Sequence, residues 1–409
     1  MQAADLSPVP VEARTQSGWD LFLLFAAANI VATTMQVGAS LGSGLAPERM
    51  LAVVVAGACL GAALVAALAP VGSRLGVPSM VAARDPLGFR GARLVAGVLF
   101  VTNFAWIAVN NVIAASVLAR MTPLGLDERA WAIVVGVVST AVVAAGPQAV
   151  RLADRVAVPL MAAAGLAITW TVLRLPAPPV LAGDAAVAPS LATLFDVVVG
   201  YQVSWLLMFA DYSRFTASGR TSARAVFLGL ALTAIWLMPM GWRLAQQAGS
   251  ADPGAMLATA DAGLLAALLI TLATITTNFV NIYLSSLAWR SVMPAVPDRA
   301  AVWIVGLVGT TLGLTGGWLD RFAGFMTVVG SVLVPVGGVM VAHFLLRPRA
   351  VSVDALYDAR GSHAGVRWPG VVAWALGIGV YALVPVGATL AGLVTSVAAY
   401  LALGRTGAR

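Results

Sequence analysis

The sequence contains few charged residues and no lysine. Charged side chains make up 10% of the 409 residues, and all 24 basic residues are arginine. A soluble domain carries about 25% charged residues, so this chain has too few to cover a water-facing surface. Because 60% of the residues are hydrophobic, the composition predicts an integral membrane protein whose main solvent is the lipid bilayer.

Other scarcities exclude whole classes of function. The single cysteine, Cys59, allows no internal disulfide. The two histidines, His343 and His363, fall at a predicted helix end and in a loop, with no HExxH motif or carboxylate pair inside an apolar run. The sequence therefore predicts neither an enzyme nor a metal centre with histidine ligands. The net charge of +7 comes from scattered arginines without a basic stripe, which argues against a nucleic-acid partner.

Twelve apolar runs are long enough to cross a bilayer as helices. They occupy residues 20–45, 50–72, 92–119, 130–148, 153–173, 190–210, 224–246, 261–287, 301–318, 322–346, 369–385 and 387–404. No long polar segment remains for a soluble domain, and residues 347–368 are predicted to be a connector. Residues 1–18 are polar and lack the apolar core of a cleavable signal.

The arginines also predict the topology. If the N-terminus is placed inside, 18 of the 24 arginines fall in inner segments and 6 in outer ones. Cytoplasmic segments of membrane proteins are enriched in arginine and lysine. We therefore predict a multi-pass protein of the cytoplasmic membrane, with cytoplasmic tails at 1–18 and 405–409.

Polar residues inside the third run indicate a binding site, because such residues are costly at membrane depth. The stretch VTNFAWIAVNN places Asn103, Trp106 and Asn110 on one helix face. Their carboxamides donate and accept hydrogen bonds, and the indole offers a flat stacking surface, which suits a planar ligand with amide-like edges. The alternative is that these asparagines join neighbouring helices beside a packing tryptophan.

Glycines and polar residues also coincide in the first and sixth runs. In the first run, Gln36 is followed by Gly38, Gly42 and Gly44, and the sixth contains Gly200, Tyr201 and Gln202. Such glycines favour unwinding where a cavity can satisfy the backbone. Interrupted helices in matching positions of two repeats indicate the central site of a transporter. The alternative is that the glycines form close packing faces.

The eighth run contains a candidate cation site. Ala273, Thr276 and Thr277 share one helix face, and their oxygens suit a hard cation such as Na⁺. The alternative is that both hydroxyls bond back to their own helix. Because no carboxylate falls clearly at mid-membrane, the sequence favours Na⁺ over H⁺ and a neutral substrate over a cationic one.

The sequence resembles the nucleobase:cation symporter-1 family over residues 20–400. The resemblance is carried by ASLGSGL, NFAWIAVNN, ADYSRF, TITTNFVN and FMTVVGSVLVPVGGVMVAHFLL, in that order. It implies an all-α LeuT-type fold of five plus five inverted helices, with the first and sixth broken. The ten-helix core would span residues 19–346, and the connector and two additional helices would span 347–404.

The resemblance implies that a heterocycle stacks on Trp106, with Asn103 and Asn110 one turn to either side. On the sixth helix the matching residues are Tyr201 and Gln202; relatives often carry an aromatic at the second position, so Tyr201 is an alternative stacking partner. Gln36 and Asn281 complete the predicted substrate contacts. A sodium site would use backbone oxygens near Ala32 and Met35, the Ala273 carbonyl, and the Thr276 and Thr277 hydroxyls.

The sequence therefore predicts a secondary active importer of a neutral planar heterocycle. Cytosine and hydroxymethylpyrimidine are the leading substrates, and no cofactor is expected apart from the coupling ion, Na⁺ or alternatively H⁺. Alternatives are a hydantoin, allantoin or purine symporter of the same family and a passive facilitator without ion coupling. A membrane receptor or enzyme is disfavoured because neither a soluble domain nor a catalytic cluster is evident.

Overall fold

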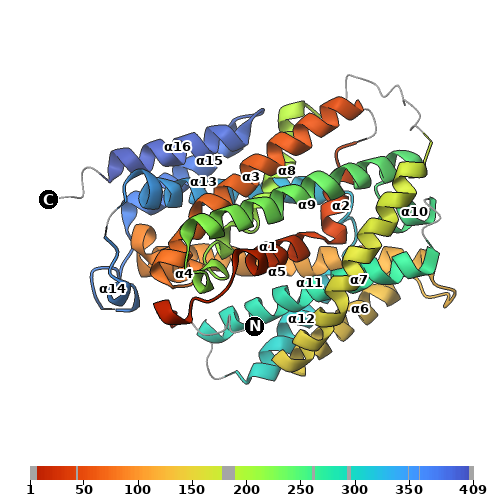
Figure 1. The fold of residues 1–409 in the computed structure, drawn as a ribbon, viewed down its shortest axis with the longest axis horizontal. Coiled ribbons are helices and arrows are strands. Elements are labelled where there is room, and N and C mark those ends of the chain that lie inside the picture. Colours follow the sequence, from red (N-terminus) through yellow and green to blue (C-terminus); the bar gives the residue numbers. More distant parts are fainter. Residues whose placement is uncertain are drawn as a thin grey trace.

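The computed structural model describes residues 7–42, 45–176, 189–259, 263–292, 296–348, 350–358 and 360–404. Within these ranges the secondary structure is helical, and extended pairing is limited to one bridge between Thr15 and Thr216. Figure 1 shows long helices packed side by side in an elongated bundle. The tail predicted at 405–409 lies outside the described residues, as do residues 1–6.

Each predicted span corresponds to a long helix or to a broken one. These are α1 (Gly18–Asn29) with α2 (Ala32–Ala39), α3 (Pro47–Leu75), α5 (Arg84–Met121), α6 (Glu128–Ala144), α7 (Pro147–Arg174), α8 (Leu191–Val203), α9 (Gly219–Ala248), α11 (Gly263–Val292), α12 (Asp298–Gly313), α13 (Phe322–Val341), α15 (Trp368–Leu383) and α16 (Ala388–Leu403). In the described ranges, four helices can each cross a membrane by length and composition, and the pair α1–α2 is a fifth candidate.

The remaining elements are short. They are α4 (Ser79–Ala82), α10 (Pro253–Thr259), α14 (Val353–Tyr357), the 3₁₀ turns η1 (Val11–Ala13), η2 (Leu206–Met208) and η3 (Ser213–Phe215), and the π-helical turn η4 (Ala342–Leu346). The fifth span begins earlier than the predicted residue 153. Gly146 has φ +101°, which ends the preceding helix, and Pro147 occupies the first turn of α7.

The first and sixth spans are broken, as predicted. The axes of α1 and α2 differ by 56° across the break at residues 30 and 31. Helix α8 ends at Val203 and is followed by the turns η2 and η3 instead of a continuous helix. The arrangement leaves backbone groups near the middle of the bundle that are not part of a regular helix.

The breaks do not lie at Gly38 or Gly200, which corrects the expectation from the sequence for these two glycines. Gly44 lies outside the described residues. Gly38 is helical, and a side chain there would collide with the carbonyl of Met238 on α9. Gly200 is helical too, and its Cα faces the carbonyl of Met326 on α13. The packing alternative is therefore correct for both glycines: they allow two backbones to approach closely.

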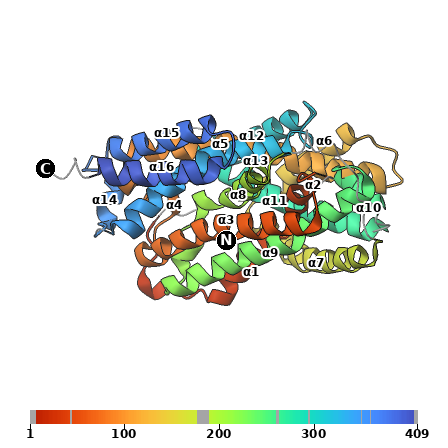
Figure 2. The ribbon, with the colours of Figure 1, turned by 90° about the horizontal axis from the view of Figure 1, so that it is seen from above.

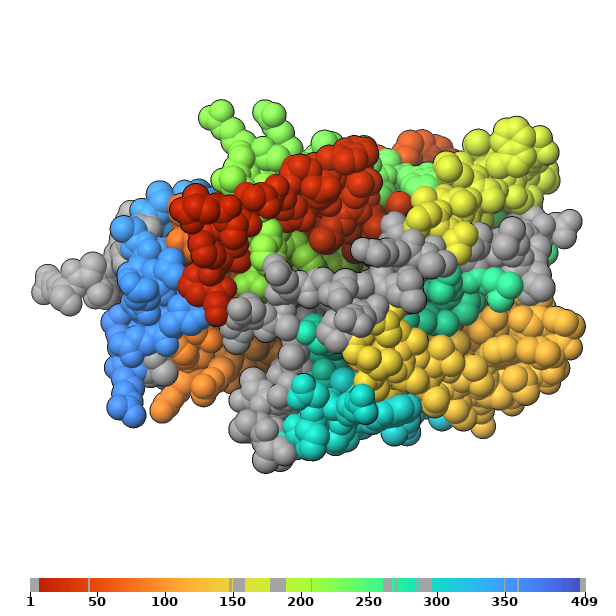
Figure 3. Space-filling view, turned by 60° about the horizontal axis from the view of Figure 1, so that its bottom comes forward, coloured from red at the N-terminus to blue at the C-terminus, as the bar shows by residue number. Residues whose placement is uncertain are grey.

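The outer parts of the bundle are arranged around these broken helices. Figure 2 shows α15 and α16 along one side of the molecule and α7 at the opposite edge. In Figure 3, the N-terminal segment and α1 lie on the surface, and the blue segment around α14 lies at one end. Trp374 on α15 donates a 2.9 Å hydrogen bond from its indole to the Val332 carbonyl on α13. The C-terminal pair is thus joined to α13.

The predicted connector does more than link two helices. His363 in this segment contacts Asp85 at 3.0 Å, and Arg367 at its end contacts the same carboxylate at 3.1 Å. His343, at the end of the α13 span, contacts the other Asp85 oxygen at 2.8 Å. Both histidines therefore contact one buried carboxylate at the beginning of α5, an arrangement that was not predicted from the sequence.

Candidate substrate and cation site

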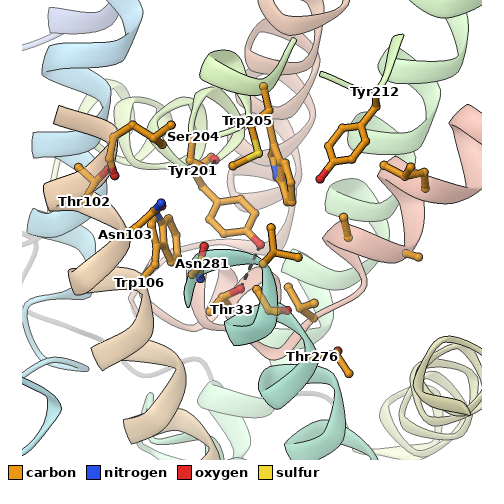
Figure 4. Close-up of a pocket in the computed structure, with 18 of the residues that line it drawn as sticks. Thr33, Thr102, Asn103, Trp106, Tyr201, Ser204, Trp205, Tyr212, Thr276 and Asn281 are labelled. Atoms are coloured by element: carbon orange, nitrogen blue, oxygen red, sulfur yellow. Dashed lines mark hydrogen bonds between the residues drawn. The ribbon is translucent and has the colours of Figure 1, made fainter. Parts of the chain in front are cut away.

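A cavity of about 460 Å³ lies between the broken helices and α5, α7, α11 and α13. Four predicted substrate residues line it: Asn103, Trp106, Tyr201 and Asn281. Figure 4 shows these side chains around one space, with Thr33 below Tyr201 and Trp205 beside it. None of the described residues that line the cavity is charged. The cavity is therefore suited to a neutral ligand.

Aromatic rings form one end of the cavity. Trp106 and Tyr201 meet edge to face, with ring centroids 6.0 Å apart and planes inclined by 70°. Behind Trp106, Phe325 and Phe322 of α13 contact the indole at centroid distances of 5.2 and 6.4 Å. These rings restrict the orientation of the indole because each packs against it edge to face. Trp106 can then offer a flat surface to a planar ligand.

Two carboxamides complete this end of the cavity. Asn103 of α5 is 3% exposed and Asn281 of α11 is 8% exposed. Neither side chain hydrogen-bonds to another described residue, although both line the cavity. A buried carboxamide is costly when its donors and acceptor lack partners. These two groups are available to hydrogen-bond the edge of a ligand.

Three predicted substrate residues lie outside this cavity. Asn110 donates to Asn278 at 3.1 Å, which agrees with the interhelical alternative for this residue. Gln202 donates to the Leu230 carbonyl at 3.0 Å, so Tyr201 rather than Gln202 faces the cavity. Gln36 is fully buried, and neither atom of its amide group has a partner in the described part of the chain.

The predicted cation ligands come from two neighbouring helices. Ala32 and Met35 of α2 and Ala273 of α11 line one small cavity of about 20 Å³. Thr276 and Thr277 line the larger cavity, and both donate to the Ala273 carbonyl, at 2.9 and 3.0 Å. In this structure both hydroxyls therefore bond back to their own helix, which was the alternative to a cation site. The same three oxygens nevertheless lie together beside the start of α2.

Several residues of the cavity were not predicted. Thr33, Ser204, Trp205, Tyr212 and Phe215 line it, and four of these follow the end of α8. Only ADYSRF, which contains Tyr212 and Phe215, stood out in the sequence. The irregular turns after α8 place these side chains, so helical spacing could not identify them.

A second cavity of about 660 Å³ lies beyond the aromatic rings. It is lined by Trp318, whose ring centroid is 6.4 Å from that of Phe325, and by the ion pair between Arg120 and Asp252. Because Phe325 also contacts Trp106, a chain of three rings lies between the two cavities. The structure thus has one cavity on each side of Trp106.

Comparisons with known proteins agree with this architecture. Residues 8–404 match a family described as permeases for cytosine/purines, uracil, thiamine and allantoin. The chain belongs to the nucleobase:cation symporter-1 family. It is 27% identical to the cytosine permease of Escherichia coli (strain K12) over 394 residues, which cover 94% of this chain and 91% of the relative. These relatives are permeases, in agreement with the prediction of a transporter rather than an enzyme.

Solved structures of this family show the same fold. The inward-facing conformation of Mhp1 superimposes with a TM-score of 0.85 at 19% identity, covering 98% of this chain and 93% of Mhp1. A closed conformation of Mhp1 with bromovinylhydantoin bound gives a TM-score of 0.81 at 20% identity, covering 98% and 94%. The LeuT-type membrane fold predicted from the sequence is therefore confirmed.

Proposed function

We propose that this permease imports a neutral pyrimidine, cytosine or a close relative such as hydroxymethylpyrimidine, together with Na⁺. Transport proceeds by alternating access between the two cavities on either side of Trp106. The observation that carries this proposal is the cavity itself: among the described residues its lining is uncharged, and an oriented indole occurs there with two carboxamides that have no described partner.

The chemistry of the cavity supports a planar heterocycle. A pyrimidine can stack on the indole of Trp106, while its ring nitrogens and exocyclic groups bond to the amides of Asn103 and Asn281. A zwitterionic or cationic substrate would require a charged partner, and the described lining has none. The similarity to cytosine permease from Escherichia coli adds independent support for a pyrimidine.

The oxygens beside the substrate cavity support cation coupling. Ala32 and Met35 share a small cavity with Ala273, and the two threonine hydroxyls adjoin it. Sodium binding would require the hydroxyls to turn from the Ala273 carbonyl so that all three oxygens face the ion. Carbonyl and hydroxyl oxygens coordinate a metal cation without taking up or releasing a proton. This set of ligands therefore favours Na⁺ over H⁺.

The position of the cavity supports an inward-facing state. The substrate cavity extends from Trp106 to Gln16 and Phe215, near the N-terminal segment. The arginine distribution predicts that this end is cytoplasmic. With that orientation, the substrate cavity opens to the cytoplasm of the cell, and the second cavity, at Arg120 and Asp252, faces outward.

A binding screen with purified protein tests this function. Melting temperatures are compared for cytosine, hydroxymethylpyrimidine, uracil, hydantoin and allantoin, each with sodium and with choline. A ligand that binds the folded state raises the melting temperature. The proposal predicts the largest shifts for the two leading pyrimidines, and larger shifts in sodium. Stabilisation only by hydantoin or allantoin would replace the proposed substrate, and equal shifts in both buffers would reject sodium coupling.

A further inference from the structure

The hydroxyl of Tyr201 belongs to a directed chain of hydrogen bonds. Thr34 Oγ1 lies 2.6 Å from the Asn29 carbonyl oxygen, which can only accept, so Thr34 donates its proton there. The Tyr201 hydroxyl, 2.6 Å from Thr34 Oγ1, must then donate to Thr34. Thr33 Oγ1, at 3.2 Å, is left to donate to Tyr201. The order is therefore Thr33 to Tyr201 to Thr34 to the Asn29 carbonyl.

This chain ends at the break in the first span. Asn29 is the last residue of α1, and the carbonyls at a helix end have no partner within the helix. Thr34 provides that partner from the first turn of α2. The chain of hydroxyls thus ties both sides of the break to α8, which carries Tyr201.

The side chains of Asn29 and Gln202 connect the end of α1 and α8 to α9. Asn29 Nδ2 donates to the Leu230 carbonyl at 3.1 Å and to Thr233 Oγ1 at 2.8 Å. Gln202, next to Tyr201, donates to the same Leu230 carbonyl at 3.0 Å. Residues 201 and 202 are therefore both connected to Asn29, one through Thr34 and one through Leu230. Gln202 has a structural partner here, which explains why it does not face the cavity.

The two ends of the Tyr201 side chain face different sites. Its ring lines the substrate cavity beside Trp106, and its hydroxyl reaches Thr33 (Figure 4). The same hydroxyl reaches Thr34. These threonines lie in the turn that contains Ala32 and precedes Met35, the backbone positions of the proposed cation site. A ligand that orders the Tyr201 ring also orders its hydroxyl, and hence this turn.

We propose that Tyr201 is a positioning residue that couples the substrate and cation sites through Thr34. This inference rests on the proposed cation symport. A heterocycle that packs against the ring fixes the hydroxyl chain, and the chain holds the first turn of α2 in the arrangement that the cation needs. By reciprocity, a cation that orders this turn holds Tyr201 in place for the substrate. Thr33 and Thr34 contribute through their hydroxyls and need no contact with either ligand.

The test compares Thr34→Val with Thr34→Ser in the intact protein. Valine keeps the branched shape but removes the hydroxyl, whereas serine keeps the hydroxyl. The dissociation constant of cytosine is measured in sodium and in choline at equal ionic strength. For the wild type, sodium should tighten binding by a factor within the usual range for coupled sites, about 5 to 150. We expect Thr34→Val to reduce this factor below about twofold and Thr34→Ser to retain most of it.

A second variant covers the case in which Thr34→Val does not fold. Tyr201→Phe keeps the ring that faces the cavity and removes only the hydroxyl, so it should also lose the sodium effect. A purely structural role would lower the melting temperature but leave the ratio of the two dissociation constants unchanged. If Thr34→Val, or Tyr201→Phe in its place, retains the wild-type ratio, the inference is overturned.

The outcomes also separate this inference from the proposed function. If sodium tightens cytosine binding in the wild type and in Thr34→Val but not in Thr277→Ala, cation symport stands and only the coupling role of Tyr201 falls. If sodium has no effect on the wild type, or if cytosine does not bind it, the proposed function fails and this inference fails with it.

Discussion

The indole of Trp106 and the phenol of Tyr201 face one cavity at a centroid distance of 6.0 Å, although 95 positions separate them in the sequence. One ring comes from a continuous helix, α5, and the other from α8, just before the sixth span breaks. A flat ligand that touches both rings would contact a continuous helix and a broken one simultaneously. The two residues thus connect ligand binding to the part of the fold that has an irregular backbone.

Replacing Trp106 with alanine should weaken cytosine binding strongly. Loss of an aromatic stacking surface costs about 1–3 kcal/mol per base in proteins that bind single strands, which corresponds to about 5- to 150-fold in the dissociation constant. Trp106→Phe should lose less, because a smaller ring remains. Equilibrium binding of labelled cytosine measures both variants. Near-normal binding by Trp106→Ala would place the substrate elsewhere.

Replacing Thr277 with alanine should remove the response to sodium. The hydroxyl is one of the proposed cation ligands, and Thr277 lies at the wall of the substrate cavity. We expect cytosine affinity in choline to change little and the gain in sodium to disappear. Thr311→Ala is the matched control, since its exposed hydroxyl bonds only to its own helix. If Thr277→Ala keeps the sodium response, the Thr277 hydroxyl only bonds to the Ala273 carbonyl and is not a cation ligand.

Replacing Asp85 with alanine should destabilise the folded protein. Asp85 is 7% exposed and accepts from His343, His363 and Arg367, so the variant leaves three polar groups without their partner. Removal of one member of a buried charged network costs on the order of 3–5 kcal/mol. Thermal unfolding in detergent should show a clear decrease in melting temperature. Asp354→Ala, at an exposed position of α14, should leave it nearly unchanged.

Replacing Gly241 with alanine should disturb the packing of α9 on α2. A methyl group there would collide with the backbone of Met35, a proposed cation ligand, and backbone cannot move aside as a flexible side chain can. Overpacking of this kind costs about 1–3 kcal/mol or more. Gly379→Ala on α15 is the control, because a methyl group there meets open space. Equal melting temperatures for the two variants would contradict this packing.

The orientation in the membrane can be checked with reporter fusions. We expect a reporter at residue 409 to be active on the cytoplasmic side, because the arginines concentrate in segments on that side for every alternation of the twelve spans. A fusion in the segment between α5 and α6 should report the opposite side. A periplasmic C-terminus would contradict both the span count and the inward-facing interpretation of the substrate cavity.

The spans and the type of fold could be predicted because lipid imposes long apolar runs and a biased arginine distribution. Trp106 and Asn103 could be identified because polar residues are rare at membrane depth. Asn110 shares their face by spacing, but it lies one turn further, where Asn278 on α11 is its neighbour. Sequence spacing defines a face of a helix and does not specify which part of that face meets a cavity.

The position of the breaks depended on contacts that the sequence does not display. Glycine density indicated unwinding, yet Gly38 and Gly200 are needed where helical backbones touch. The break after α1 is instead stabilised by Thr34 and Asn29, through hydrogen bonds to residues far away in the chain. The role of Asp85 with both histidines was hidden for the same reason, since 258 positions separate Asp85 from His343.

The most direct test of sodium-coupled import is uptake of labelled cytosine into proteoliposomes that contain the purified protein. An inward sodium gradient, in the absence of a proton gradient, should drive accumulation above the external concentration, and choline should not. Trp106→Ala in the same membranes should show no accumulation. Equal uptake with sodium and choline, reaching only the external concentration, would contradict sodium symport and identify a passive facilitator.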